Sequence, residues 1–261
     1  MLAPEQIEQI ADELLAAGRT GSVVPRITVR YPDMTVEDAY AVQALWASRR
    51  VAEGHRVVGR KIGLTSKPMQ AATGITEPDY GVIFDDNVLE SGAVIAFDEF
   101  SNVRVEVELA FLLGKPLKGP GCTIFDVLSA TDYVVPALEV LNSHIELTGR
   151  TIVDTISDNA ALGAMVTGGR PVRVDQADLR WASALLYKNE SIEDSGVAAA
   201  VLGHPAAGVA WLANKLAPHG GQLTAGEIIL AGSFTRPMWI AKGDVVHADY
   251  GTLGAVTCRF T

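Results

Sequence analysis

Two glutamates on one expected strand are the most informative chemical feature of the sequence. In the segment Arg104–Phe111, apolar residues alternate with charged ones, which is the period-two pattern of a β-strand. Glu106 and Glu108 then project from one face of that strand, about 7 Å apart at ~3.3 Å per residue. Two ionised carboxylates at that distance repel each other unless a cation lies between them. The spacing indicates a cation site; the alternative is a solvated strand face that carries incidental acids.

A third acid lies inside a second expected strand, Asp132–Leu141. Glu139 is surrounded there by apolar residues, and burying a lone carboxylate is costly unless it is paired or binds a metal. Three carboxylates with no His or Cys beside them suit a hard cation such as Mg²⁺ or Mn²⁺ better than Zn²⁺. If the two strands are neighbours, Glu106, Glu108 and Glu139 form one metal site.

Two further residues are candidates for proton transfer. Lys61 lies in the glycine-containing segment Gly59–Ser66, where glycines permit close approach of the backbone to a ligand. It can bind a substrate carboxylate or transfer a proton after a pKa shift, and the alternative is an ordinary surface lysine. Asp79 lies in Glu77–Gly81, which its proline and glycine predict to be a turn. Asp79 is either a general base or only a turn residue.

A loop of small residues is expected at Gly232–Pro237, after the apolar run Glu227–Ala231. Its backbone N–H groups and the hydroxyls of Ser233 and Thr235 can bind an anion. Arg236 can hold a carboxylate through two parallel hydrogen bonds. An ordinary loop between strands is the alternative.

The first fifty or so residues predict helices. Apolar residues recur at helical spacing from Ile7 to Leu15, and Gly18 is the expected stop. A second helix is expected to begin at Thr35, where a Thr-x-x-acid spacing forms a capping box. Residues 1–54 are therefore expected to form an N-terminal helical subdomain.

Residues 55–261 predict a β-rich core. Short runs of β-branched and aromatic residues are separated by Gly, Pro, Asp and Asn, and a regular β-α-β alternation is absent. Two helices are expected in this part, one near Thr123 and one over Pro205–Leu216. Ser66 is the expected N-cap of a further short helix that ends at Gly74. The fold class is therefore α+β, with the helical subdomain and the β core in one continuous unit.

The bulk composition narrows the class of protein. The chain has 261 residues, 48% of them hydrophobic, and a formal net charge of −10, which argues against a nucleic-acid partner. No signal-peptide pattern opens it, and no apolar run approaches the ~18 residues of a membrane helix. P-loop, dinucleotide-binding and Gly-x-Ser-x-Gly motifs are absent. A cytoplasmic enzyme is expected, and a non-catalytic, metal-dependent binder of small dicarboxylates is the alternative.

In combination these motifs resemble the fumarylacetoacetate hydrolase superfamily, and within it the hydratase/decarboxylase branch that acts on products of aromatic ring cleavage. The resemblance extends over almost the whole chain. Besides the helical N-terminus, it is carried by these segments: Lys61–Ser66, Glu77–Gly81, Glu106–Glu108, Ala130–Glu139, Asp154–Asn159, His204-Pro205, Trp211–Asn214 and Gly232–Pro237. It implies a helical N-terminal part on a mixed β-sandwich or roll of the fumarylacetoacetate hydrolase C-terminal type, in a homo-oligomer.

The resemblance also implies roles for individual residues. Glu106, Glu108 and Glu139 would hold Mg²⁺ or Mn²⁺, and Lys61 and Asp79 would handle protons. Four residues are expected to bind the substrate: Leu64, Ser233, Thr235 and Arg236, the last through a distal carboxylate.

The activity implied is that of a hydro-lyase, which adds water to a 2-hydroxydienoate or 2-oxo-enoate in aromatic catabolism. The segments at 77–81 and 232–237 favour 2-oxohept-4-ene-1,7-dioate as substrate and 4-hydroxy-2-oxoheptanedioate as product. Two other activities need similar groups. One is decarboxylation of 2-oxo-3-hexenedioate (4-oxalocrotonate) at the same metal site, and the other is C–C hydrolysis of acylpyruvates.

Overall fold

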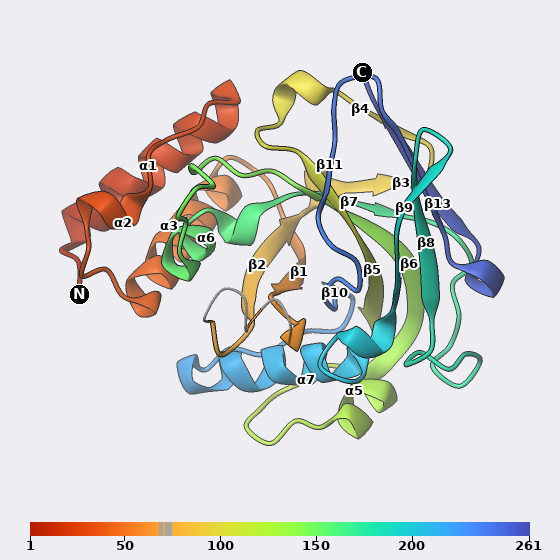
Figure 1. Ribbon diagram of the computed structural model, residues 1–261. Helices are drawn as coiled ribbons and strands as arrows, with labels where there is room; N and C mark the ends of the chain where they lie inside the picture. The colour runs from red at the N-terminus through yellow and green to blue at the C-terminus, as the bar shows by residue number, and fades with distance from the viewer. Residues whose placement is uncertain (68–69, 71–74) are drawn as a thin grey trace.

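The structure is a computed structural model that describes residues 1–67, 70 and 75–261 (Figure 1). Its helices are α1 (Pro4–Thr20), α2 (Ile27–Arg30), α3 (Val36–Ala52), α5 (Ile124–Ala130), α6 (Ile152–Ser157) and α7 (Pro205–Leu216). Its strands are β1 (Val57–Gly63), β2 (Asp79–Phe84), β3 (Val88–Glu90), β4 (Ala93–Ile95), β5 (Arg104–Leu113), β6 (Thr131–Leu141), β7 (Leu162–Thr167), β8 (Ser183–Lys188), β9 (Ser191–Val197), β10 (Ile228–Leu230), β11 (Met238–Trp239), β12 (Val245–Asp249) and β13 (Ala255–Phe260). This mixture of helices and mixed sheets confirms the α+β class.

The N-terminal helices form largely as their sequences predict. The Thr35 hydroxyl accepts a hydrogen bond from the N–H of Asp38, so the capping box at the start of α3 is confirmed. The predicted stop at Gly18 is wrong, because α1 continues to Thr20. A glycine ends a helix where the chain turns left-handed, and Gly21, with φ of 64°, is the residue that does so.

The N-terminal helices pack against the first strands of the core. Figure 1 shows α1, α2, α3 and α6 together on one side of the molecule, beside β1 and β2. The buried Gln43 side chain on α3 donates hydrogen bonds to the carbonyls of Tyr80 and Ile156, at 2.9 and 3.1 Å. A division between residues 54 and 55 remains a prediction.

An eight-stranded mixed sheet carries the predicted acids. Its strand order is β2-β1-β10-β5-β6-β7-β3, and β11 pairs with β5 off this path. β5 and β6 are antiparallel neighbours over almost their whole length, with Glu106 directly opposite Glu139. Because side chains alternate along a strand, Glu106, Glu108 and Glu139 share one face of the sheet. The two strands are therefore neighbours, which is the condition for one shared site of the three acids.

The opposite face of this sheet forms the main core. Val105, Val107 and Leu109 of β5 are fully buried there, in one cluster with residues of the second sheet such as Val246 and Val256. The second sheet has five strands in the order β4-β13-β12-β8-β9, and both sheets are visibly curved in Figure 1. The apolar members of the alternating pattern therefore hold β5 between the core and the acidic face.

The structure differs from the sequence-based predictions at two places, and a third prediction lies largely outside the described residues. The predicted turn at Glu77–Gly81 is wrong from Asp79 onward, because the apolar run that follows pairs with β1 and draws Asp79 into β2. The helix α6 was not expected from the sequence. It is short, and Thr151 caps its start in a capping box with Asp154. The helix expected between Ser66 and Gly74 lies largely outside the described residues.

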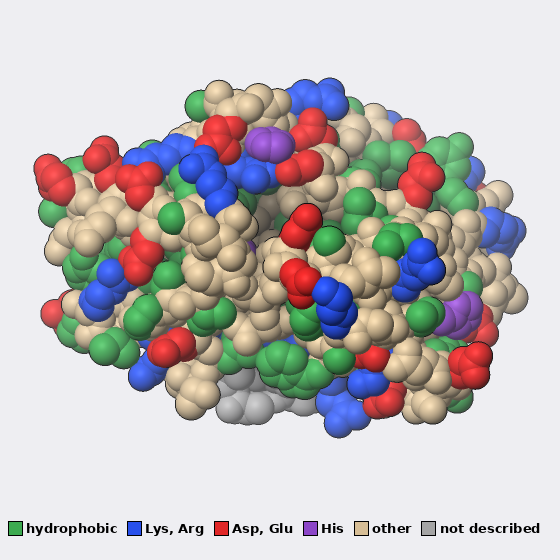
Figure 2. Space-filling view, turned by 90° about the horizontal axis from the view of Figure 1, so that it is seen from above, with side chains coloured by type: hydrophobic (Ala, Val, Ile, Leu, Met, Phe, Trp, Pro, Cys, Tyr) green, Lys and Arg blue, Asp and Glu red, His purple; other side chains and the backbone are tan. Residues whose placement is uncertain are grey.

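The face shown in Figure 2 carries charged side chains of both signs among hydrophobic and uncharged ones. Among the residues that the structure describes, no helix is both long enough and apolar enough to cross a membrane.

Candidate metal centre and active site

The three predicted acids meet on the face of the main sheet. Glu106, Glu108 and Glu139 each offer a carboxylate oxygen, and these oxygens all lie within 4.8 Å of one another. Glu108 and Glu139 are each only 1% exposed. One oxygen of Glu108 accepts a hydrogen bond from the N–H of Gly232 at 2.9 Å, whereas its other oxygen is buried and has no hydrogen-bond partner among the described residues. An orphaned buried carboxylate oxygen that faces two further acids fits a cation ligand.

The pKa values of these acids show what their proximity costs. Burial, together with the charge of Glu139, raises the pKa of Glu106 to about 8. Burial and the charges of Glu139 and Glu106 raise the pKa of Glu108 well above its ordinary range. Three carboxylates cannot all ionise cheaply here without a compensating positive charge. Because every donor is a carboxylate oxygen, the set fits a hard divalent cation.

Lys61 lies beside the three acids. β1 carries it to the same sheet, and its Nζ is 3.2 Å from Oε1 of Glu139, with both residues almost fully buried. Burial lowers the pKa of Lys61, but the charges of Glu139 and Asp79, followed by those of the other two glutamates, outweigh this and hold the pKa above its ordinary value. The side chain is therefore an ammonium ion in the absence of a metal, and the surface-lysine alternative is excluded.

Asp79 enters the site from the neighbouring strand. It is 1% exposed and lies opposite Gly63 in the β1–β2 register. In the described part of the chain, neither of its carboxylate oxygens accepts a hydrogen bond of normal geometry. Burial raises the pKa of Asp79, and the charge of Lys61 offsets this only in part. A buried carboxyl group whose pKa is raised is a candidate for proton transfer.

Gly63 allows Lys61 and Asp79 to converge. A Cβ atom at this position would lie 2.1 Å from Oδ1 of Asp79 and 3.3 Å from Nζ of Lys61. We expect Gly63→Ala to lower kcat by about 10²-fold, because a displacement of about 1 Å in reacting groups has effects of that size. Gly18→Ala is the matched control, since a Cβ there meets only His144, at 3.8 Å. Equal kcat values for the two variants would contradict this account of Gly63.

The loop Gly232–Pro237 runs along β5 beside the acids. The Thr235 hydroxyl accepts a hydrogen bond from the N–H of Val107 at 3.1 Å, and the Ser233 hydroxyl bonds to the backbone of Thr235. The Thr235 hydroxyl and the N–H of Gly232 thus hold the loop against the strand that carries Glu106 and Glu108, whereas the Ser233 hydroxyl stabilises the loop itself. A role of Ser233 and Thr235 in substrate binding remains a prediction.

The structure does not bring the Arg236 guanidinium to the acids. This side chain is 80% exposed, and its Nε pairs with Asp194 at 3.2 Å. Leu64 follows the Lys61 strand in a left-handed conformation, with φ of 56°, and its carbonyl accepts a hydrogen bond from the Gln70 amide. The substrate contacts of Arg236 and Leu64 also remain predictions.

Two arginines border the site without having been predicted. Arg104 Nη2 and Arg150 Nη1 both donate to the hydroxyl of Ser143, at 2.8 and 3.0 Å. Burial lowers the pKa of both arginines, and their charges in turn lower the pKa of Glu106 and of Asp79, respectively. Arg104 could have been found, since it shares the strand face of Glu106. Arg150 and Ser143 carry no local signal.

A second cluster of possible metal ligands lies elsewhere in the described residues and is less suited to bind a cation. His55, Asp85 and Asp86 also cluster, but the two aspartates already pair with Arg56 and Arg50 near the surface.

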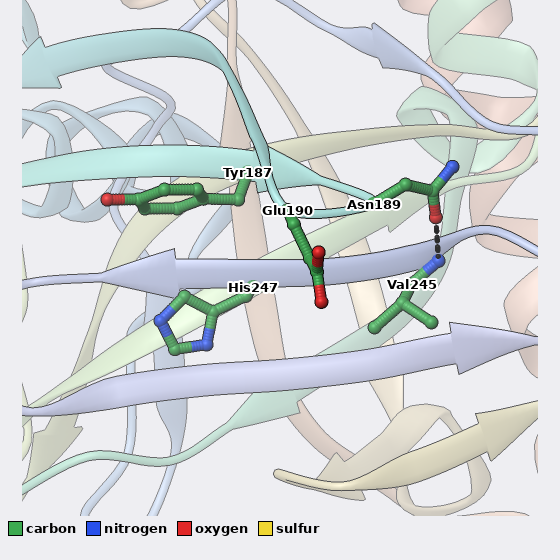
Figure 3. Close-up of a pocket in the computed structure, with 5 residues that line it drawn as sticks. All are labelled: Tyr187, Asn189, Glu190, Val245 and His247. Atoms are coloured by element: carbon green, nitrogen blue, oxygen red, sulfur yellow. Dashed lines mark hydrogen bonds between the residues drawn. The ribbon is translucent and has the colours of Figure 1, made fainter.

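A cavity of about 640 Å³ lies on the second sheet. Figure 3 shows its lining on β8, β12 and the adjoining turn: Tyr187, Asn189, Glu190, Val245 and His247. None of the predicted site residues lines it, and it gathers no set of acids. The candidate site is therefore the face of the main sheet that carries the three glutamates.

The sequence is similar to those of several known enzymes. The chain is 54% identical to 2-oxo-hept-4-ene-1,7-dioate hydratase of Escherichia coli, over 96% of each protein. It is 38% identical to 4-oxalocrotonate decarboxylase of Pseudomonas sp. (strain CF600), over 99% of this chain and 98% of that protein.

Among solved structures, 4-oxalocrotonate decarboxylase from Pseudomonas putida G7, complexed with magnesium and adipate, superposes with a TM-score of 0.98. It is 36% identical, and the match covers 100% of this chain and 99% of that one. Residues 51–261 match the fumarylacetoacetate (FAA) hydrolase C-terminal family. This chain therefore belongs to the fumarylacetoacetate hydrolase family.

Proposed function

We propose that this protein is a metal-dependent hydro-lyase that adds water to a 2-oxo-enoate, with 2-oxohept-4-ene-1,7-dioate as substrate and 4-hydroxy-2-oxoheptanedioate as product. The observation that carries the proposal is the meeting of three carboxylates with a buried Lys61–Asp79 pair on one sheet face. The similarity to a hydratase of that substrate over almost the whole chain supports it.

Glu106, Glu108 and Glu139 would hold the cation, and we propose Mg²⁺ or Mn²⁺ because the donors are all hard oxygens. When bound, such a cation supplies Lewis-acid stabilisation of negative charge that develops on the 2-oxo oxygen of the substrate. The buried, water-poor setting of Glu108 and Glu139 makes each electrostatic interaction there stronger than in solvent.

Lys61 and Asp79 would move the protons. Isomerisation takes a proton from C3 and returns one to C5, which brings the double bond into conjugation with the 2-oxo group and makes C4 electrophilic. The oxygen of water then adds to C4, and a proton returns to C3. Asp79 has a raised pKa, and neither of its oxygens accepts a hydrogen bond of normal geometry from the described residues, so it can exchange a proton with substrate or water. The Lys61 ammonium offsets part of the negative charge of Glu139, Asp79 and the other two glutamates.

Decarboxylation of 2-oxo-3-hexenedioate is the second candidate. The likeness to a decarboxylase structure over the whole chain favours it. It would require the same three glutamates and the same Lys61–Asp79 pair, because it too leaves an enolate that must be protonated.

One assay separates these functions. Purified protein with Mg²⁺ or Mn²⁺ is given 2-oxohept-4-ene-1,7-dioate or 2-oxo-3-hexenedioate, and the products are followed by NMR together with CO₂ release. We expect the 4-hydroxy-2-oxo product from the first substrate, and loss of turnover with EDTA. Faster CO₂ release from the second substrate than hydration of the first would assign a decarboxylase. Binding of both compounds without turnover would identify a non-catalytic binder.

A further inference from the structure

Arg104 and Arg150 present two positive charges at one point beside the site. Arg104 lies at the start of β5 and Arg150 just before α6, yet both donate to the same hydroxyl oxygen, Oγ of Ser143. Ser143 is completely buried and both arginines are partly buried. Within the described residues, neither guanidinium forms an ion pair with a carboxylate.

The charges of Asp158, Asp79 and Asp154 act on Arg150, and those of Glu106 and Glu139 on Arg104, but none of these carboxylates forms an ion pair with either guanidinium within the described residues. Two like charges that share one acceptor in a partly buried setting repel each other. A carboxylate between them would replace repulsion with charge-assisted hydrogen bonds, which arginine makes in pairs with planar anions. The Ser143 hydroxyl proton, which has no acceptor in the part of the chain that the structure describes, adds a third donor.

The aromatic ring of Trp239 helps to fix one of these guanidinium groups. Cζ of Arg104 lies 5.4 Å from the centroid of this ring, on the paired strand β11. The Trp239 side chain is 55% exposed, so this end of the site lies near solvent.

The distance from the acids matches the length of a small dicarboxylate. Arg104 and Glu106 are two residues apart on the same strand face, which places them about 7 Å apart along β5. The carboxyl carbons of an extended seven-carbon dioate are six bonds apart, or roughly 7 to 8 Å. Arg150 reaches the same hydroxyl from the segment just before α6, and its charge acts on Asp158 and then on Asp79.

We infer that Arg104, Arg150 and Ser143 form the subsite for the distal carboxylate of a dicarboxylic substrate. The inference rests on the proposed function in one respect, namely that the 2-oxo end of the substrate lies at the three glutamates. It transfers to Arg104 and Arg150 the role that the sequence predicts for Arg236, whose guanidinium is exposed and paired with Asp194.

The test compares a dioate with a monocarboxylate of equal length. Arg150→Gln removes the charge at a position that is separate from β5 and its glutamates. We expect the KM for 2-oxohept-4-ene-1,7-dioate to rise about 10- to 100-fold, the usual effect of losing a hydrogen bond between charged groups, and the KM for 2-oxohept-4-enoate to change little. Arg150→Lys should recover part of the loss. Arg259→Gln, an exposed arginine on β13, is the matched control.

A binding measurement keeps this inference separate from the proposed activity. Binding of heptanedioate and of heptanoate to the Mg²⁺-loaded protein is measured by calorimetry. In Arg150→Gln, the dissociation constant for heptanedioate should be about 10- to 100-fold larger than in the wild-type protein, whereas that for heptanoate should not change. That result in a protein that hydrates nothing would sustain the subsite and overturn the proposed function. If Arg150 had only a structural role, Arg150→Gln would have a lower Tm than the wild-type protein. If Arg150 mainly repels Arg104, the Tm of Arg150→Gln is unchanged or higher.

Two outcomes would overturn the subsite. The first is an equal loss for the dioate and the monocarboxylate in Arg150→Gln, which would place the arginines at the end common to both compounds. The second is a dioate-selective loss in Arg236→Gln with none in Arg150→Gln, which would return the role to Arg236.

Discussion

Glu108→Gln should abolish metal-dependent turnover, by about 10³-fold or more, and should stabilise the metal-free protein. Glutamine keeps the size of the side chain and can still accept the hydrogen bond from Gly232. It replaces one of the three carboxylates that would hold the cation with a neutral amide, and Lewis-acid stabilisation amounts to several kcal/mol of the barrier. It also removes a buried carboxylate that Glu139 and Glu106 repel, so the metal-free fold no longer bears that cost. Turnover with saturating Mg²⁺, and Tm with EDTA, are the measurements.

The stability of the metal-free protein should depend on pH in a direction that follows from the raised pKa values of the glutamates. In the folded, metal-free protein the pKa of Glu106 is about 8, whereas the unfolded chain ionises near ~4.3. The folded state therefore holds protons that the unfolded state releases, and stability falls as pH rises between these two values. The pKa of Glu108 is raised too, so Glu108→Gln should show a shallower fall between pH 5 and 8.

Glu193→Gln, at an exposed position on β9, controls for the loss of one acid. If the metal-free wild-type protein and Glu108→Gln lose stability in parallel over this pH range, the acids do not repel as described. Retention of full metal-dependent turnover in Glu108→Gln would remove this residue from the metal site.

Lys61→Met should both stop turnover and destabilise the fold. Lys61 forms a buried ion pair with Glu139, and removal of one partner of such a pair costs about 3–5 kcal/mol because the other charge is left uncompensated. Loss of a group that takes part in proton transfer lowers turnover by about 10²- to 10⁴-fold. Chemical denaturation of the metal-free protein and kcat at saturating metal measure the two effects.

A double variant separates the two roles of Lys61. Lys61→Met combined with Glu139→Gln removes both members of the pair, and we expect it to regain most of the lost stability but none of the turnover. Lys118→Met, at an exposed lysine, is the control for charge loss. A stable, fully active Lys61→Met protein would contradict both the ion pair and the catalytic role.

Local features of the chain account for much of what the sequence predicts correctly. Thr35 and Thr123 begin helices because their hydroxyls cap free N–H groups only three residues away. Alternation in β5 places Glu106 and Glu108 on one face because the side-chain period of a strand is two. Where local signals compete, prediction fails: Asp79 lies beside a proline typical of turns, yet pairing with β1 draws it into a strand.

The three glutamates show how far the sequence alone determines this protein. It indicates that Glu139, among apolar neighbours, is costly to bury unless it is paired or binds a metal, because that cost depends on neighbouring residue types. Only the tertiary structure decides that Glu139 lies opposite Glu106, that Gly63 admits both Lys61 and Asp79, and that Arg150 reaches Arg104 while Arg236 does not reach the acids. Strand register and contacts between distant segments depend on packing of the whole core, and a one-residue shift would turn each of these strand side chains to the other face.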